Sequence, residues 1–254
     1  MKTLKGKIAI VTGASRGIGR AIALRFGKEG AIVAVHYSQN EGAANETVRE
    51  IESLGSQAFA IQHQFGVETD IQSFFKKLDT KLQHVTGDTQ FDILVNNAGI
   101  SGMGLIEEVT EDVFDKVMAV NLKSPFFLIQ QALDRIRDGG RIINISSVSV
   151  KVIYPGTITY NLSKAGLNIL TQNLAKQLGP RNITVNALMP GVVETEINRG
   201  MLNNPEAKKH AAQTSVFRRL GQVEDIADIA AFIASSDSRW ITGQLVDAAG
   251  GGLL

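Results

Sequence analysis

The start of the chain joins a strand, a glycine-rich turn and a helix, and this unit constrains the fold more than any other feature. Residues Lys7 to Thr12 form a short, largely β-branched run that predicts a buried strand. A turn with three glycines follows, and the apolar periodicity of 18–26 predicts a helix. A second apolar run, Ala31 to Tyr37, completes a βαβ unit.

The glycine turn reads Thr12-Gly13-Ala14-Ser15-Arg16-Gly17-Ile18-Gly19. Glycines let the backbone come close to a pyrophosphate, and the helix N-terminus presents free N–H groups to the anion. The spacing Gly-x-x-x-Gly-x-Gly differs from the Gly-x-Gly-x-x-Gly of the usual dinucleotide fingerprint. The turn therefore predicts a dinucleotide site, with an ordinary strand-to-helix turn as the alternative.

The end of the second strand indicates which dinucleotide is bound. Sites for NAD usually place an acid there for the ribose hydroxyls, whereas 36–40 reads His-Tyr-Ser-Gln-Asn. Arg16 lies in the glycine turn, and a guanidinium suits a 2′-phosphate. We expect NADP(H), with NAD(H) also admitted. The alternative role for Arg16 is to cover the adenine face.

The rest of the chain alternates strands and helices. Further strands are expected at 57–62, 91–95, 140–147, 183–188 and 244–247, and helices at 41–54, 69–85, 110–137, up to 178 and at 223–234. The pattern predicts an α/β fold, a single Rossmann-type doubly wound parallel sheet of about seven strands with helices on both faces. No repeat or linker interrupts it, so 1–254 is expected to form one domain.

Ligands of such sheets bind at the carboxyl ends of the strands. On this topology the glycine turn, Asn96–Gly99, Ser147 and Pro190–Gly191 all share one edge of the sheet. The polar, uneven stretch 195–216 is expected to be a mobile lid over that edge.

Tyr160 and Lys164 lie four residues apart, hence on one face of a helix and one turn apart. An ammonium about 5 Å from a phenolate attracts it by about 3 kcal/mol at an effective dielectric of about 20. That is expected to lower the Tyr160 pKa by roughly two units, so that the phenol can exchange a proton with a carbonyl or alcohol. A solvated Tyr/Lys helix face is the alternative when the motif stands alone.

Asn121 falls within the predicted helix 110–137, where an amide has poor helix propensity. Pro125 should disturb the helix next to it and free backbone groups for a polar site. A surface asparagine beside a tolerated proline is the alternative.

Composition excludes several classes of function. The net charge of +1 and the lack of a long charged run argue against nucleic acid and anionic membranes. There is no cysteine, and the N-terminus lacks the apolar stretch of a signal peptide, which is compatible with the cytoplasm. The 4 histidines have no spacing that indicates a metal site.

Taken together, these motifs resemble the short-chain dehydrogenase/reductase family over essentially the whole chain. The resemblance lies in Thr12-Gly13-x-x-x-Gly17-x-Gly19, Asn96-Asn97-Ala98-Gly99, Asn121, Ser147, Tyr160-x-x-x-Lys164 and Pro190-Gly191. The residue sequence of the glycine turn most resembles that of 3-oxoacyl-[acyl-carrier-protein] reductases, although family members of other specificity share it. The resemblance implies a homotetramer that forms through the long helix and the Tyr/Lys helix.

The resemblance also implies a role for each matching residue. Tyr160 would protonate the carbonyl oxygen, Ser147 would hydrogen-bond the same oxygen, and Lys164 would lower the Tyr160 pKa and bind the ribose. Asn121 would hold a water that links Lys164 to solvent. Expected cofactor contacts are Gly13, Ser15, Arg16, Gly17, Ile18, Gly19, Tyr37, Ser38, Gln64, Asn97, Ala98, Gly99, Tyr160, Lys164, Pro190, Gly191, Val193 and Thr195.

One departure from the family pattern concerns Gln64, which stands where the family usually has an aspartate that binds the adenine amino group. The substrate is expected to be a small or acyl-carrier-bound carbonyl compound. Alternatives are reduction of another ketone, sugar or steroid-like molecule, an epimerase or dehydratase of sugar nucleotides, and a regulator that binds NADP without turnover. For an acyl-carrier substrate, a basic patch would be formed by Arg199, Lys208, Lys209, Arg218 and Arg219.

Overall fold

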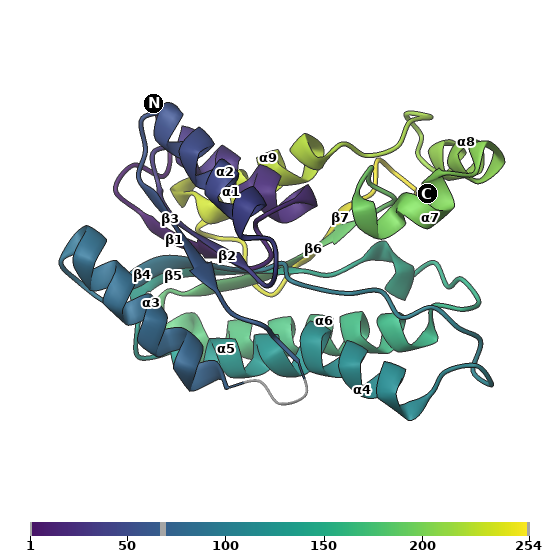
Figure 1. Ribbon diagram of the computed structural model, residues 1–254, viewed down its shortest axis with the longest axis horizontal. Coiled ribbons are helices and arrows are strands. Elements are labelled where there is room, and N and C mark those ends of the chain that lie inside the picture. The colour runs from purple at the N-terminus through teal and green to yellow at the C-terminus, as the bar shows by residue number, and fades with distance from the viewer. Residues whose placement is uncertain (1, 67–69, 253–254) are drawn as a thin grey trace.

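The computed structural model describes residues 2–66 and 70–252, which form one seven-stranded sheet between two layers of helices (Figure 1). Every neighbouring pair of strands is parallel, and the order is β3-β2-β1-β4-β5-β6-β7. The strands are β1 (Ile8–Val11), β2 (Ile32–Tyr37), β3 (Ala58–Gln62), β4 (Phe91–Asn96), β5 (Ile136–Ile145), β6 (Thr184–Pro190) and β7 (Leu245–Ala248). The predicted Rossmann-type sheet is confirmed, and its order reverses between β1 and β4.

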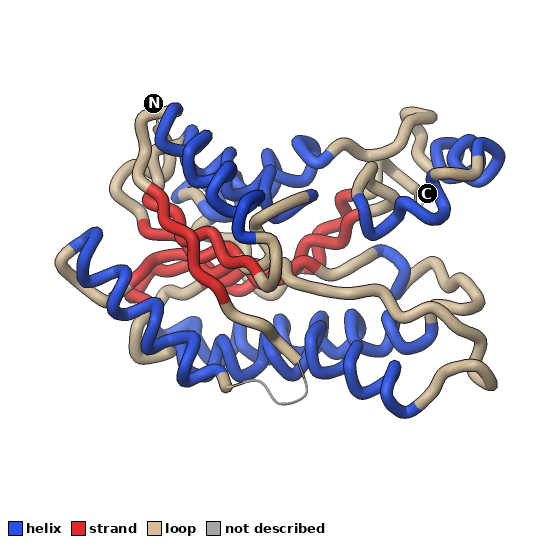
Figure 2. Tube along the Cα trace, viewed as in Figure 1, coloured by secondary structure: helices blue, strands red, loops and turns tan. Residues whose placement is uncertain are grey.

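Figures 1 and 2 show α1, α2 and α9 on one face of the sheet and α3 to α6 on the other. The helices are α1 (Gly17–Lys28), α2 (Glu41–Ser53), α3 (Ile71–Thr86), α4 (Glu111–Met118), α5 (Ser124–Ala132), α6 (Ile158–Leu178), α7 (Arg199–Leu202), α8 (Pro205–Gln213) and α9 (Val223–Ala234). Successive strand residues serve opposite faces, so Val33 and Val35 join the core under α1 while Ala34 joins the core under α3. Burial on both faces explains the continuous apolar runs.

Several predicted boundaries are wrong in an instructive way. The helix predicted for 110–137 ends at Ala132, and β5 already begins at Ile136. Gly139 and Gly140 resemble a turn before the strand, but they lie within it, at a shift in the register with β4, where Gly139 has φ +77°. Strand β6 continues through Pro190, which is tolerated at the strand end.

Two further segments differ from expectation. Asp70 caps α3 by accepting from the Ser73 N–H, whereas Thr69, where the helix was expected to begin, lies outside the described residues. The predicted lid, 195–216, is not irregular throughout, because it contains α7 and α8.

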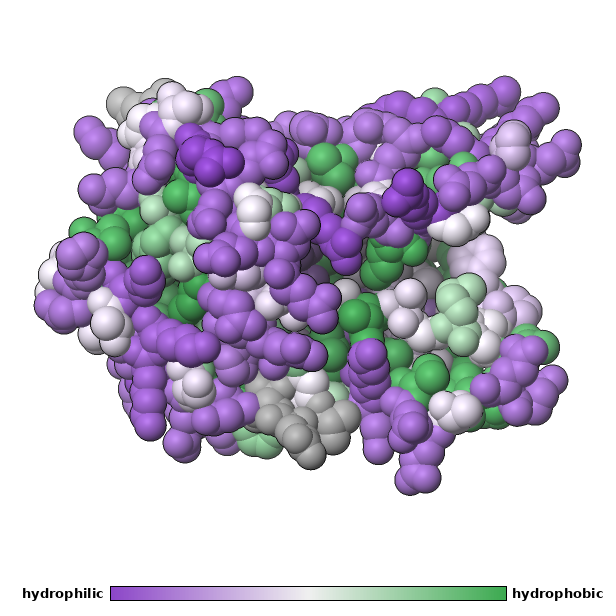
Figure 3. Space-filling model, viewed as in Figure 1, coloured by the Kyte–Doolittle hydropathy of each residue, from purple (hydrophilic) through white to green (hydrophobic). Residues whose placement is uncertain are grey.

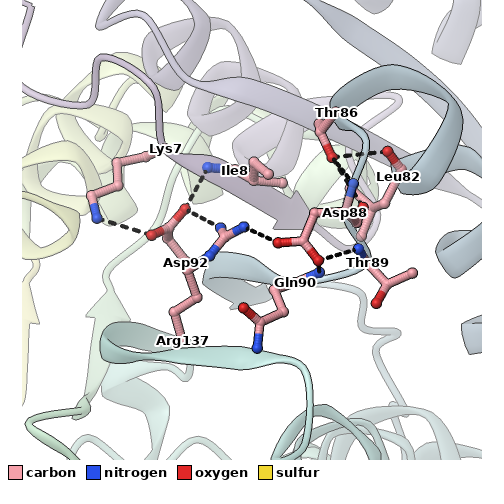
Figure 4. Close-up of polar contacts among 9 residues, drawn as sticks. All are labelled: Lys7, Ile8, Leu82, Thr86, Asp88, Thr89, Gln90, Asp92 and Arg137. Atoms are coloured by element: carbon pink, nitrogen blue, oxygen red, sulfur yellow. Dashed lines mark hydrogen bonds and ion pairs between the residues drawn. The ribbon is translucent and has the colours of Figure 1, made fainter.

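The edge of the sheet opposite the carboxyl ends is tied together by Asp92 (Figure 4). Its carboxylate accepts from Lys7 Nζ at 2.9 Å, from the Ile8 N–H at 2.9 Å and from Arg137 Nη1 at 3.2 Å. Arg137 also donates to Asp88 at 2.7 Å. These charge-assisted bonds compensate for the burial of Asp92 and join β1, β4 and β5 at their amino ends.

Candidate active site

The turn after β1 packs directly on the turn after β4. Asn97 Nδ2 donates to the carbonyl oxygens of Thr12 at 2.8 Å and Gly13 at 3.1 Å. Thr12 Oγ1 accepts from the N–H groups of Asn97 at 2.8 Å and Ala98 at 3.0 Å. A side chain at Gly19 would collide with the Gly13 oxygen and the Asn97 amide, so only glycine fits there. The two turns form one cradle where the strand order reverses.

The first turn of α1 is open to an anion. Within the described part of the chain, Arg16 at the N-cap makes no side-chain cap, and the first turn holds no acid. The first N–H groups of a helix lack intrahelical partners and carry partial positive charge. Thr195 lies beside Gly17, where an added Cβ would be 3.6 Å from Thr195 Cγ2. Arg16 is exposed and forms an ion pair with Glu196. This donor set fits a pyrophosphate.

The adenine side of the predicted site contains residues of differing exposure. Ser38 and Gln64 are exposed beyond the ends of β2 and β3. Tyr37 is buried, its hydroxyl bonds to Glu41, and burial is the main reason that its pKa is raised. Tyr37 is therefore part of the core under α2 rather than an exposed surface.

The predicted catalytic residues converge at the carboxyl end of β5. Ser147 follows β5 and interacts with the phenol of Tyr160, which lies near the start of α6. Lys164 is one turn further along α6, and its Nζ is 5.6 Å from the centre of the Tyr160 ring. Nζ donates to the main-chain oxygen of Ile145 at 2.7 Å. The structure thus brings together the groups that the spacing predicted.

The predicted pKa of Tyr160 is wrong for the chain by itself. Burial raises the pKa of Tyr160, and the hydrogen bond with Ser147 opposes this rise only in part. Burial also lowers the pKa of Lys164, to about 8. Because both charged forms lose solvation in the interior, desolvation outweighs the attraction inferred from the four-residue spacing.

Asn121 lies in a π-helical segment, Ala119–Lys123, between α4 and α5. Its Nδ2 donates to the Ile100 oxygen at 2.9 Å and to Ser163 Oγ at 3.1 Å, and its Oδ1 accepts from the Ile100 N–H at 2.9 Å. Pro125 has no N–H, so the Asn121 carbonyl lacks its usual helical donor. The predicted disturbance of the helix is confirmed. Because both Nδ2 hydrogens are already used, a water bound to Asn121 would have to donate to this carbonyl oxygen or to Oδ1.

The remaining predicted contacts lie at the same sheet edge. An added Cβ at Gly99 would lie 3.3 Å from Asn121 Oδ1 and 3.6 Å from Lys164 Nζ, so these residues meet. After β6, the Gly191 N–H donates to the Ala248 oxygen at 3.2 Å, and Val193 is buried.

Sequence reasoning missed several residues that hold this site: Thr12, His36, Ile145 and Ser163. Thr12 and Ser163 lie inside recognised motifs, so their position was a usable signal. Ile145 contributes only a main-chain oxygen, which no side-chain pattern reveals. His36 has no metal-ligand spacing and counts in the sequence only as a non-acidic residue at the end of the second strand, whereas in the structure it is a buried hydrogen-bonding residue.

Two features are absent from the described residues, 2–66 and 70–252: a cluster of metal ligands and a membrane-spanning helix. In these residues, no group of three or more histidine, cysteine, aspartate or glutamate side chains is placed to hold a metal ion. Within the same ranges, no helix has the length and apolar character needed to cross a bilayer.

Comparisons with known proteins find several relatives that are named as reductases. The sequence model of a family described as enoyl-(acyl carrier protein) reductase matches residues 13–252. The crystal structure of the angucycline C-6 ketoreductase LanV with bound NADP has a TM-score of 0.95 and 47% identity, covering 99% of this chain and 97% of that one. Versicolorin reductase of Emericella nidulans is 38% identical, over 98% of this chain and 96% of its own. The 3-oxoacyl-[acyl-carrier-protein] reductase FabG of Staphylococcus aureus is 38% identical, over 96% and 97%.

Proposed function

The chain belongs to the short-chain dehydrogenase/reductase family, and on that premise we propose that it is an NADP(H)-dependent reductase that converts a ketone to an alcohol, or catalyses the reverse. The observation that carries the proposal is that Ser147, the Tyr160 phenol and Lys164 meet at the same sheet edge as the glycine cradle. An acid and a hydrogen-bond donor that meet at one point can serve one carbonyl oxygen.

The chain's own residues supply the proton. The bound cofactor would provide the hydride. Tyr160 donates its phenolic proton to the carbonyl oxygen, and Ser147 stabilises the charge that develops on this oxygen. Lys164, with a pKa lowered to about 8, offers a readily released proton one helical turn from the phenol. It would also bind the ribose, since Gly99 leaves space beside its Nζ.

The proposed preference for NADP(H) rests on Arg16. Its guanidinium is exposed at the start of α1, and no acid occurs between 36 and 40 to repel a 2′-phosphate. Glu196 holds Arg16 in the structure, so the phosphate would compete with Glu196 for it. The relative LanV, crystallised with NADP, supports this choice.

For the substrate, we favour a bulky and largely apolar ketone over an acyl-carrier-bound one. Exposed apolar side chains border the edge from three directions: Met103 and Ile106 after β4, Ile153 and Tyr154 after β5, and Ile197, Met201 and Val216 in the lid, with Phe217 directly after it. Figure 3 shows apolar surface on both sides of the indentation between the α7–α8 segment and the layer below the sheet. The names of two relatives, an angucycline ketoreductase and a versicolorin reductase, support the same choice.

The basic patch expected for an acyl carrier protein is weakened in the structure. Lys208 forms an ion pair with Glu194, and Arg219 pairs with Asp225. These partners neutralise part of the positive charge that an acidic carrier would need. We keep 3-oxoacyl-[acyl-carrier-protein] reduction as the second candidate, because FabG matches nearly the whole chain.

We also propose that 195–216 is a lid and that the protein forms a homotetramer. The ion pair between Arg16 and Glu196, which joins the lid to the start of α1, is exposed and therefore weak enough to break when the lid opens. Exposed apolar residues lie on α4, α5 and α6, the helices through which the tetramer was expected to form. They are Phe114, Phe126, Phe127, Leu162 and Ile169. Sedimentation of the purified protein would measure the assembly.

The function is tested by following NADPH oxidation with a panel of ketones that includes multi-ring apolar ketones, small sugars and an acyl-carrier-bound 3-oxoacyl group. The proposal expects turnover, with the highest kcat/KM for the apolar ketones. Tight NADPH binding without turnover on any of them would favour the regulator. If the carrier-bound substrate is preferred and its KM rises with salt, the second candidate is correct.

A further inference from the structure

His36, near the carboxyl end of β2, is buried and hydrogen-bonded through both ring nitrogens. The Gly13 N–H donates to Nδ1 at 3.0 Å, and Nε2 lies 2.9 Å from the His63 carbonyl oxygen. The His36 main-chain oxygen also accepts from the Ala14 N–H at 2.8 Å. One residue therefore holds two successive amides of the turn after β1 and reaches the chain after β3.

The partners of the His36 ring determine its tautomer. Gly13 can only donate, so Nδ1 must be the bare nitrogen, and the carbonyl of His63 can only accept, so Nε2 carries the hydrogen. Burial lowers the pKa of His36 to about 3, which keeps the ring neutral under ordinary assay conditions. Phe65 stacks on the ring at 4.5 Å, and Phe74 meets it edge-on at 5.7 Å. The ring is thus fixed in both position and tautomer.

Gly13 needs such support because it adopts φ +63° and packs against the turn after β4. Asn97 holds the Gly13 carbonyl, but the Gly13 N–H has its partner in His36 alone among the contacts of the described residues. With Gly13 and Ala14 both held by His36, the amides left for a ligand are those at the start of α1. His36 therefore engages the Gly13 and Ala14 amides, so that neither is free to face a ligand.

We propose that His36 is a positioning residue for the cofactor, which holds the Gly13 turn in its pyrophosphate-binding shape through the hydrogen bond at Nδ1. The inference rests on the proposed use of NADP(H). His36 does not reach the catalytic residues, so its effect is on cofactor affinity and not on the chemical step.

Three substitutions separate the two hydrogen bonds of the ring. Asn Oδ1 is attached to Cγ as Nδ1 is, so His36→Asn keeps an acceptor for Gly13 and loses the link to His63. The Nε2 of Gln matches the imidazole Nε2, so His36→Gln keeps the link to His63 and loses the acceptor. His36→Phe keeps the stacking and loses both bonds. His63→Phe is the control, because His63 contributes its main-chain oxygen and its Nε2 has no partner among the described residues.

The readouts are the Kd of NADPH, from the fluorescence of the bound nucleotide, and kcat at saturating NADPH. His36→Gln and His36→Phe should bind NADPH about tenfold more weakly, a change of about 1.4 kcal/mol, because the buried Gly13 N–H loses its acceptor and the turn is no longer held in shape. His36→Asn and His63→Phe should stay within about threefold of the wild type. Values of kcat should stay within about twofold in all variants, which a general folding defect would not give.

The role is overturned if His36→Asn binds as weakly as His36→Phe, or if all three variants bind like the wild type. It is also overturned if ¹⁵N NMR of the wild type shows hydrogen on Nδ1 of His36. Should His36→Phe fail to fold, the comparison of Asn with Gln decides the question. A wild-type protein that does not bind NADPH would instead overturn the proposed function, together with the inference built on it.

Discussion

Lys164 Nζ donates to the main-chain oxygen of Ile145 at 2.7 Å, so the last residue of β5 anchors the ammonium of α6. The carbonyl compensates only part of the lost hydration, and the pKa of Lys164 falls to about 8. The strand end thus fixes where the lysine lies, and the interior determines how firmly it holds its proton.

The depressed pKa of Lys164 predicts a rise of stability with pH. Between the folded value of about 8 and the ordinary value of 10.5, the unfolded lysine binds a proton that the folded one lacks, so the free energy of unfolding increases with pH. The full increment is about 3 kcal/mol. The measurement is urea unfolding of the wild type and of Lys164→Met at about pH 8 and at about pH 10. The free energy of unfolding of the wild type, minus that of the variant, should be larger at the higher pH. A difference that does not grow with pH would contradict the buried lysine.

Replacing Tyr160 by Phe should abolish turnover and leave cofactor binding intact. The phenol supplies the proton, and general acid catalysis contributes about 10²–10⁴-fold. The loss should appear in kcat, while the Kd of NADPH changes by less than about threefold. Near-normal activity of the variant would show that another group protonates the substrate. Tyr154→Phe is the matched control, because it removes a hydroxyl that borders the proposed substrate site but transfers no proton, so any effect should fall on KM and not on kcat.

Arg16→Ala should weaken NADPH selectively. A charge-assisted bond to the 2′-phosphate is worth about 1.5–3 kcal/mol, so the KM for NADPH should rise by about tenfold or more. The KM for NADH, which lacks that phosphate, should change little. Arg49 is exposed on α2, and Arg49→Ala controls for the loss of a surface charge. Equal effects on both cofactors would assign Arg16 to the adenine face.

Asp92→Ala should destabilise the fold without affecting catalysis. It leaves Lys7, Arg137 and the Ile8 N–H without their shared acceptor, and stranding the buried Ile8 N–H is expected to cost about 1–3 kcal/mol. Asp138 pairs with Arg181 at the surface, and Asp138→Ala should lower stability by no more than about 1 kcal/mol. Comparable losses in the two variants would show that the cluster at Asp92 is not special.

The local pattern of apolar residues and glycines was sufficient to predict the strands and helices whose apolar side chains are buried. The βαβ unit, the helix from Val223 to Ala234 and the site at the carboxyl ends follow from periodicity and glycine placement. Gly139 and Gly140 misled the prediction, because a bulge inside a strand and a turn before it have the same composition. Which one forms depends on pairing with β4, and that pairing is remote in sequence.

The acid–base properties of the site could not be predicted from spacing. The distance between Tyr160 and Lys164 along α6 gives the sign of their interaction but says nothing of the solvent that each loses. His36 shows the same limit, since its partners come from β1 and from the chain after β3, and no local motif joins them.

The fit of Gly19 beneath the Gly13 carbonyl and the Asn97 amide has a consequence for sequence divergence. The carbonyl belongs to the backbone of the turn after β1 and cannot retreat, so replacing Asn97 alone would not make room for a larger residue at 19. Position 19 is therefore expected to stay glycine even in relatives whose residue at 97, 78 positions away, differs.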